Sequence, residues 1–156
     1  MPCLSGNYDR AAGILVNVGI LPHQQFAAIQ QAGLGASPQT PLGQLPIFMG
    51  LLDTGASVTC ISDKIIKAVG LQPSGKTMMS GSTGQSSVDQ YSFCVVFMFG
   101  LQQTPTGQFT GQVNVRLVQG CEFTSHGFGF DVLIGRDILC QGALMLSFDG
   151  HYTISF

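Results

Sequence analysis

Charged residues are scarce in this 156-residue sequence: Lys, Arg, Asp and Glu together make up 9% of it, whereas about a quarter of an average soluble domain is charged. The six basic residues are scattered along the chain, and the formal net charge is −2. No basic stripe is therefore present to neutralise a phosphate backbone, and we expect no nucleic-acid partner. A surface so poor in charge also favours association with another protein chain.

Long hydrophobic runs are missing as well. The longest apolar stretches, Gly13–Pro22 and Phe93–Leu101, are about half as long as the roughly 20 residues that a membrane-spanning helix needs. No basic segment precedes the first stretch, as it would in a cleaved signal peptide. We expect no membrane segment and a cytoplasmic location.

Metal-ligand and nucleophile motifs are also absent. The five cysteines lie far apart with no C-x-x-C pair, and the three histidines are isolated from them and from one another. Neither the G-x-S-x-G string of serine hydrolases nor the phosphate-loop string G-x-x-x-x-G-K followed by Ser or Thr occurs. We expect reduced thiols, no metal ion and no cofactor.

Hydrophobic residues make up 45% of the sequence and fall into short segments between turn residues. Their β-branched content and alternation predict strands over residues 14–21, 47–52, 58–61, 76–80, 88–99, 111–118 and 130–134. Within the predicted strand over residues 111–118, Val113, Val115 and Leu117 alternate with polar residues, which predicts one buried and one wet strand face. The pattern indicates an all-β, mostly antiparallel fold in a single domain over residues 1–156.

A few helices interrupt the strands. Ser62–Val69 has a capping residue at its start, an apolar face, and Gly70 just beyond its end, which predicts a helix. We expect further short helices over Arg136–Cys140 and, from a weaker pattern, His23–Ala32, followed by a loop over residues 33–45. The Asp149-Gly150 pair predicts a hairpin near the C-terminus.

The chemical signal lies where one predicted strand ends. Asp53 follows a run of apolar residues and is itself followed by Thr54 and Gly55, so an acid stands at a strand end on a tight turn. Asp and Gly also favour ordinary turns, so this string alone is only suggestive. A second element further along the chain, Val132–Leu139, has apolar residues, a glycine and then a short amphipathic segment.

Together these two segments resemble the retropepsin family of aspartic proteases, and most closely its bacterial single-domain members. The resemblance implies a closed six-stranded β-barrel with a flap hairpin and two or three short helices. It also implies that Leu133, Ile134 and Gly135 pack beneath the Asp-Thr-Gly loop. Residues 22–45 would then be an insertion between the first two barrel strands.

The resemblance implies that Asp53, Thr54 and Gly55 form the catalytic loop. Asp53 would be half of a catalytic pair, Thr54 would hydrogen-bond across a subunit interface, and Gly55 would let the backbone approach the acid. The chain holds a single Asp-Thr-Gly string, so the second carboxylate must come from a second copy. The expected partners are therefore a homodimer mate and a peptide or protein substrate.

Residues around the loop carry the implied substrate contacts. Ala56 and Ser57 would face the substrate from the loop, while the flap would contribute a set of four residues: Met79, Ser80, Gly81 and Ser82. Arg136 would support the site from behind. Retroviral relatives often have Asp where this chain has Ser57, and there it pairs with the arginine, so the partner of Arg136 stays open.

Two functions are consistent with these residues. The first is an aspartic endopeptidase that acts as a homodimer and hydrolyses peptide bonds through a water activated by the paired Asp53 carboxylates. The alternative is a non-catalytic or latent retropepsin-like module for dimerisation or peptide binding. An intact Asp53 loop favours the first.

Overall fold

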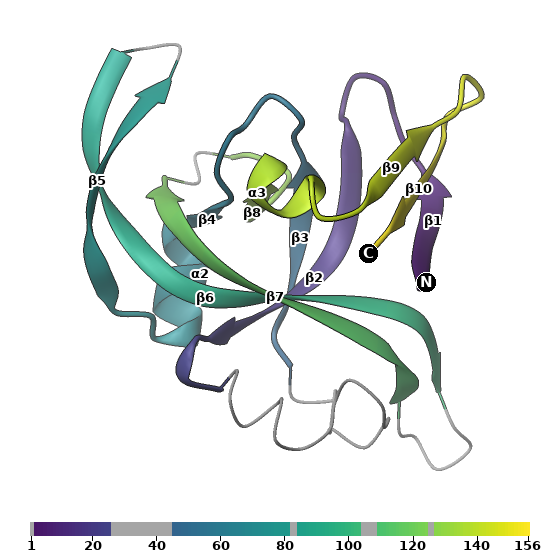
Figure 1. Ribbon diagram of the computed structural model, residues 1–156, viewed down its shortest axis with the longest axis horizontal. Helices are drawn as coiled ribbons and strands as arrows, with labels where there is room; N and C mark the ends of the chain where they lie inside the picture. Colours follow the sequence, from purple (N-terminus) through teal and green to yellow (C-terminus); the bar gives the residue numbers. More distant parts are fainter. Residues whose placement is uncertain (1, 26–44, 82–83, 104–108, 125–126) are drawn as a thin grey trace.

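Six strands close a barrel in the computed structural model, which describes residues 2–25, 45–81, 84–103, 109–124 and 127–156. In order around the barrel they are β2 (Ile14–Pro22), β3 (Ile47–Leu52), β8 (Val132–Ile134), β4 (Cys60–Ser62), β7 (Phe109–Phe123) and β6 (Gly84–Gln103). Pairing of β6 with β2 completes the ring (Figure 1). The predicted closed six-stranded barrel is therefore confirmed.

Most neighbouring strands are antiparallel, as predicted, but two pairs are parallel. β3 lies parallel to β8, and β4 lies parallel to β7. Parallel neighbours need a long crossover connection. Here the segment that connects the two strands of each parallel pair contains other strands of the fold. No local pattern in the sequence signals these two pairs, because their partners are far apart along the chain.

Alternating side chains fill the barrel. On β2, Ile14, Val16, Val18 and Ile20 are all buried, and β6 contributes every second residue from Phe93 to Phe99 in the same way. A period of two places these side chains on one face of each strand. On β6 the alternate residues Cys94, Val96 and Met98 are buried too, so both faces of that stretch are covered. Each fully buried side chain of this size contributes about 1.5–3 kcal/mol to the stability of the fold.

The face prediction for β7 is wrong. Leu117 is 47% exposed, whereas Asn114 and Arg116 bury their Oδ1 and Nε atoms. For Arg116 the reason lies at the end of the chain, where the ring of Phe156 packs at a tilt against Phe97 and lies 5.2 Å from the Arg116 guanidinium carbon. The apolar stem and flat head of an arginine can pack in this way.

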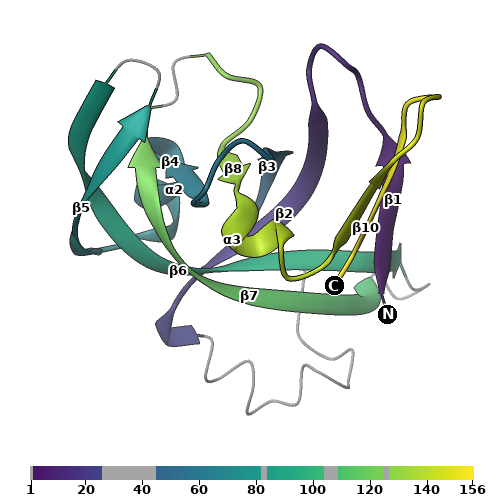
Figure 2. The same ribbon diagram turned by 45° about the horizontal axis from the view of Figure 1, so that its top comes forward.

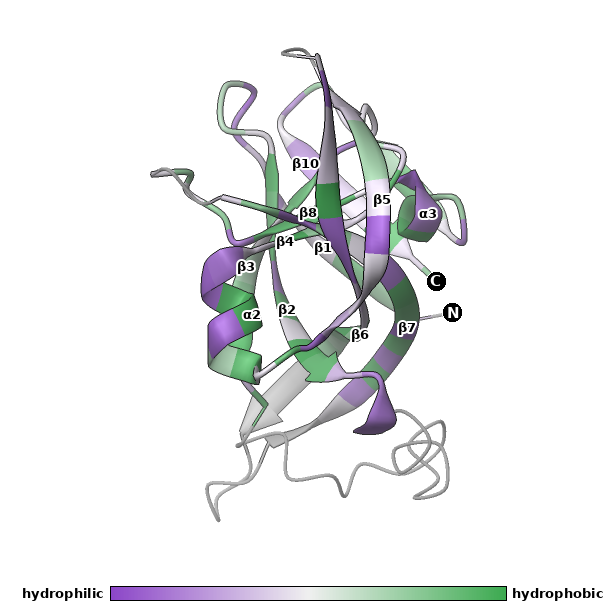
Figure 3. Ribbon diagram, turned by 90° about the vertical axis from the view of Figure 1, so that its left-hand side faces the viewer, coloured by the Kyte–Doolittle hydropathy of each residue, from purple (hydrophilic) through white to green (hydrophobic). Residues whose placement is uncertain are grey.

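Two short helices flank the barrel in the described part of the chain. The predicted helix at Ser62–Val69 is observed as α2 (Asp63–Val69), which ends at Gly70 with φ 71°. Its apolar side faces the barrel and its polar side faces outward (Figure 3). Ser62 lies at the N-cap but makes no capping hydrogen bond, contrary to the expectation. The second helix, α3, covers Arg136–Leu139.

The segment between β2 and β3 was expected to be an insertion with a helix and a loop. Residues 26–44 lie outside the described part of the chain, so the predicted helix over His23–Ala32 and the loop after it are untested. The two strands that flank this segment, β2 and β3, are antiparallel neighbours in the barrel.

A separate three-stranded sheet joins the two ends of the chain. Its order is β1 (Cys3–Asn7), β10 (His151–Ser155) and β9 (Ala143–Leu146). β9 and β10 form the hairpin predicted from Asp149-Gly150, and Gly150 has the positive φ of 87° that such a turn favours. β1 was not predicted as a strand, because its pairing partner lies at the other end of the sequence.

Another hairpin lies across the barrel from the β9–β10 hairpin and projects in the same direction. It consists of β5 (Pro73–Gly81) and the first part of β6, and Gly81 pairs with Gly84 near its tip. In Figures 1 and 2, the loop between β3 and β4 lies between this hairpin and the β9–β10 hairpin, all three at one side of the barrel. That side therefore gathers Asp53 and both projecting hairpins.

Candidate active site

Asp53 stands immediately beyond the last residue of β3, on a tight turn. Its backbone N–H donates to the carbonyl of Ile134 at 2.9 Å, so β8 fixes the point where the turn leaves the barrel. The N–H of Gly55 donates to Asp53 Oδ1 at 2.8 Å, and the N–H of Ala56 donates to the Asp53 carbonyl at 3.3 Å. These bonds hold a half-buried carboxylate at the molecular surface.

Thr54, the next residue, is exposed and its hydroxyl makes no hydrogen bond to any residue that the structure describes. Gly55 is exposed as well, while Ala56 is half-buried and Ser57 is exposed. Loop residues 53–57 therefore form part of the exposed surface of the chain. A substrate or a second subunit has access to this part of the surface.

β8 and the start of α3 lie directly against this loop. Leu133 pairs with Leu51, and Ile134 pairs with Leu52, in the parallel register of β3 and β8. A side chain at Gly135 would bring its Cβ within 2.6 Å of the Val58 carbonyl carbon. Only glycine permits this approach, so the two segments that the sequence singled out meet in space.

A buried threonine and a carboxylate tie the loop to α3. Asp137 accepts hydrogen bonds from the backbone N–H of Thr59 at 3.0 Å and from its hydroxyl at 2.7 Å. The same hydroxyl accepts a bond from the N–H of Gly135 at 3.1 Å. Sequence reasoning missed this pair, because nothing local indicates that two residues so far apart in the chain are partners.

Arg136 approaches the loop from the other side. Its backbone N–H donates to the Ala56 carbonyl at 2.9 Å, and its guanidinium Nη2 donates to Ser57 Oγ at 3.3 Å. The partner that the sequence left open is therefore the hydroxyl of Ser57. The structure brings together loop residues 53–57 and residues 133–136.

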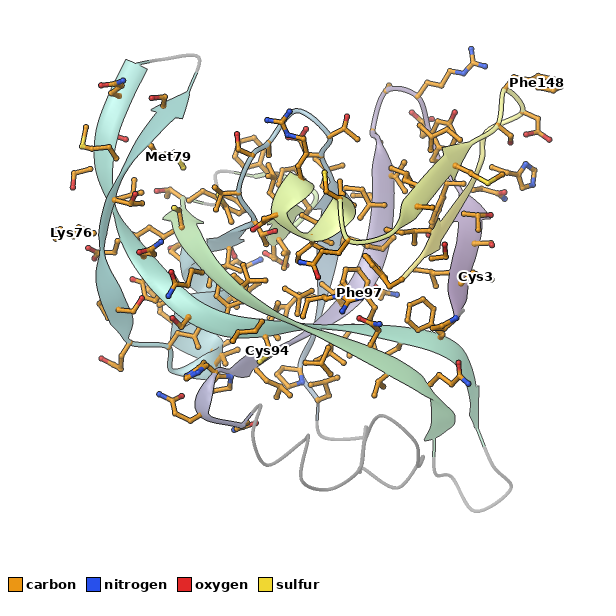
Figure 4. All side chains as sticks on the ribbon, in the orientation of Figure 1. Cys3, Lys76, Met79, Cys94, Phe97 and Phe148 are labelled. Carbon is orange, nitrogen blue, oxygen red and sulfur yellow. The ribbon has the colours of Figure 1, made fainter. Side chains whose placement is uncertain are left out.

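The predicted flap residues lie apart from this cluster, on the β5–β6 hairpin. Met79 is half-buried and lies on the side of the hairpin that faces the rest of the molecule (Figure 4). Its neighbour Met78 is 64% exposed. Ser80 and Gly81 are exposed near the tip. Ser82, also predicted to contact substrate, lies outside the described residues.

Two thiols lie beneath the loop. Cys60 and Cys121 are buried register partners on β4 and β7. Burial raises the pKa of the Cys60 thiol to about 11, and it also raises the pKa of Cys121. Such thiols stay protonated and unreactive at neutral pH. Over the ranges that the structure covers, no three His, Cys, Asp or Glu side chains are grouped to hold a metal ion.

The barrel and the Asp53 loop define a retropepsin-like fold. A crystal structure of a retropepsin-like aspartic protease from Rickettsia conorii aligns with a TM-score of 0.51 at 11% sequence identity. The alignment covers 97% of this chain and 89% of that one. At so low an identity, this likeness concerns the fold.

The sequence itself assigns the family. Residues 40–137 match the aspartyl protease family, and this match includes the Asp53 loop and extends to Asp137. The chain therefore belongs to the aspartyl protease family. No curated protein matches the chain. None of the helices in the described segments is long and apolar enough to cross a membrane.

Proposed function

We propose that this protein is an aspartic endopeptidase that acts as a homodimer. The observation that carries the proposal is the Asp53 turn: a carboxylate fixed by backbone hydrogen bonds on an exposed loop, in a chain of the aspartyl protease family. Family membership supports peptidase activity on peptide or protein substrates. The second carboxylate comes from Asp53 of a second copy.

The paired carboxylates supply both an acid and a base. Two like charges held close together cannot both ionise, so the pair shares one proton, as is known for aspartic-protease dyads. The ionised Asp53 takes a proton from a water molecule, and the water oxygen forms a bond to the peptide carbonyl carbon. The protonated Asp53 gives its proton to the carbonyl oxygen. The Asp53 that took the water proton then gives it to the amide nitrogen, the other Asp53 takes back a proton from a hydroxyl of the gem-diol, and the C–N bond breaks to release an amine and a carboxylic acid.

The loop and the β5–β6 hairpin would hold the substrate between them. Gly55 and Ala56 leave room for an extended peptide beside the acid, and Ser57 offers a hydroxyl to its main chain. Met79, Ser80, Gly81 and Ser82 would close over the peptide as a flap and exclude water from the reacting bond. Thr54, whose hydroxyl has no partner in the described part of its own chain, would bind the second subunit.

The β9–β10 hairpin supports dimer formation. β9 is an edge strand, since β10 is its only partner among the described strands, and an open edge readily pairs with another chain. Met145 is 70% exposed and Phe148 is 90% exposed. Phe148 lies at the tip of the hairpin (Figure 4). Exposed apolar groups beside an open edge are typical of an interface.

The tip that carries Phe148 is held firmly by the N-terminal segment. Arg10 donates a hydrogen bond to the Phe148 carbonyl at 2.7 Å, and the Tyr8 hydroxyl donates to the Ser147 carbonyl at 3.1 Å. A side chain presented on a fixed backbone loses little freedom when it binds. Because this hairpin and the Asp53 loop lie on the same side of the barrel, an interface on that side would let the two Asp53 loops meet.

The proposal is tested by digestion of a peptide library with the wild type, Asp53→Asn and Asp63→Asn. We expect cleavage by the wild type and by Asp63→Asn, which neutralises an aspartate on α2, away from the loop. Asp53→Asn should cleave nothing while keeping the wild-type circular dichroism spectrum. A wild type that dimerises and binds peptides without Asp53-dependent cleavage would instead support the non-catalytic module.

A further inference from the structure

Arg136 differs from the other five basic residues of the chain in what its charge contacts. Three lysines pair with aspartates: Lys64 with Asp131, Lys67 with Asp63 and Lys76 with Asp89. The two other arginines are occupied as well, Arg10 by the Phe148 carbonyl and Arg116 by the ring of Phe156. Among the described residues, the Arg136 guanidinium meets only the hydroxyl of Ser57.

No carboxylate within the described ranges forms an ion pair with Arg136. Its neighbour Asp137 directs both oxygens to Thr59 instead. A guanidinium carries five N–H donors in a flat fork that matches a carboxylate. Since Arg136 is exposed, most of these donors remain available to a ligand.

The position of this cation relates it directly to the substrate. The Arg136 backbone is hydrogen-bonded to Ala56, and Ala56 is hydrogen-bonded to Asp53, so two short contacts connect the arginine to the catalytic acid. An extended peptide advances about 3.3 Å per residue and points alternate side chains to opposite sides. A peptide whose scissile bond lies at Asp53 therefore passes Arg136 within a few residues, with one side chain facing it.

We propose that Arg136 is a specificity-determining residue, which favours peptides with an acidic side chain at one position on each side of the cleaved bond. The proposal rests on the peptidase function proposed above. In a two-fold dimer the two Arg136 side chains lie on opposite sides of the paired Asp53 residues, so the preference appears both before and after the bond. Ser57 stands next to the guanidinium without neutralising it.

The test measures kcat/KM for a host peptide that carries Glu or Gln at each position in turn. With the wild type at low salt, we expect Glu to be favoured about three- to fivefold at one position on each side, which is the upper range for an exposed ion pair. Neighbouring positions should show a ratio near one. The preference should weaken at high salt, because mobile ions screen exposed charges.

Variants of the two partner residues assign the effect. Arg136→Gln should bring the Glu-to-Gln ratio to about one, because the cation is gone. Ser57→Asp should do the same, because an internal carboxylate would then occupy the guanidinium. Ser57→Asn, whose side chain has the shape of Asp but no charge, should keep the preference for Glu. An unchanged ratio in Arg136→Gln, or no preference in an active wild type, overturns the proposal.

Binding measurements separate this inference from the function on which it rests. Isothermal titration of the same Glu and Gln peptides into Asp53→Asn needs no turnover. A Glu preference that disappears in Asp53→Asn/Arg136→Gln supports the acidic subsite even if no cleavage is found. Cleavage without an Arg136-dependent preference leaves the peptidase function standing and removes the inference. Binding that is equal for Glu and Gln also removes it.

Discussion

Asp137 accepts two hydrogen bonds from Thr59, one from its backbone N–H and one from its hydroxyl, across 78 residues of sequence. The hydroxyl in turn accepts a bond from Gly135. Thr59 is fully buried, so water cannot replace any of these bonds. This pair joins the end of the Asp53 loop to the start of α3.

Replacing Thr59 with valine keeps the shape and removes the hydroxyl. We expect a loss of about 1–3 kcal/mol in the free energy of unfolding, because the Asp137 carboxylate and the Gly135 N–H each lose a partner. Urea denaturation measures the loss. A double-mutant cycle combines Thr59→Val with Asp137→Ala. The sum of the stability losses of the two single variants should exceed the loss of the double variant. Additive losses would mean that the contact does not stabilise the fold.

The Phe148 side chain offers a direct test of the proposed dimer interface. We expect Phe148→Ser to raise the dimer dissociation constant at least about tenfold, since removing a buried phenylalanine from an interface costs more than about 1.4 kcal/mol. The fold should be unaffected, because this side chain is 90% exposed in the single chain. Sedimentation velocity gives the constant.

The matched control for Phe148 is Leu117→Ser. Leu117 is also exposed and apolar, but its side chain points to the face of β7 opposite to that of Arg116, which contacts Phe156 beyond the end of β10. This variant should dimerise like the wild type. If Phe148→Ser dimerises normally as well, the interface lies elsewhere on the molecule.

The buried Cys60 thiol makes the free energy of unfolding depend on pH in the alkaline range. Because its pKa is raised from 9.0 to about 11, the folded state keeps the proton where the unfolded state loses it. Stability is therefore full below about pH 9 and falls as the pH rises toward 11, by about 2 kcal/mol for this thiol. Urea denaturation in reductant at pH 8 and at pH 10.5 measures the fall.

Two alanine variants isolate the contribution of Cys60. Cys60→Ala should lose less stability between the two pH values than the wild type, whatever its stability at pH 8. Cys3→Ala, which removes an exposed thiol, should show the same fall as the wild type. An identical fall in all three proteins would assign the pH dependence to other groups.

Local sequence patterns predicted the bounds of a barrel strand well where burial in the core determines those bounds. β3 was predicted over residues 47–52 and has these bounds, because its apolar run ends abruptly at Asp53. β4 was predicted over residues 58–61 but begins at Cys60, since Val58 belongs to the exposed loop. There the bond between Thr59 and Asp137, and not the hydrophobic pattern, determines where the strand starts.

Contacts between distant segments could not be predicted from sequence. The burial of Arg116 depends on Phe156, and β1 depends on its pairing with β10. In the site, the Asp53 loop and Gly135 were both indicated by motifs. The Thr59–Asp137 pair and the bond from Arg136 to Ser57 were not, because side-chain partners of this kind leave no periodic signal.

In the proposed enzyme, the two Asp53 carboxylates of one active site come from two chains. Wild-type and Asp53→Asn chains are mixed in equal amounts and equilibrated. The mixture should have about one quarter of the activity of a pure wild-type sample at the same total protein concentration, because only dimers with two wild-type chains are active. Activity of about half would contradict the account, since it would mean that each wild-type chain works alone.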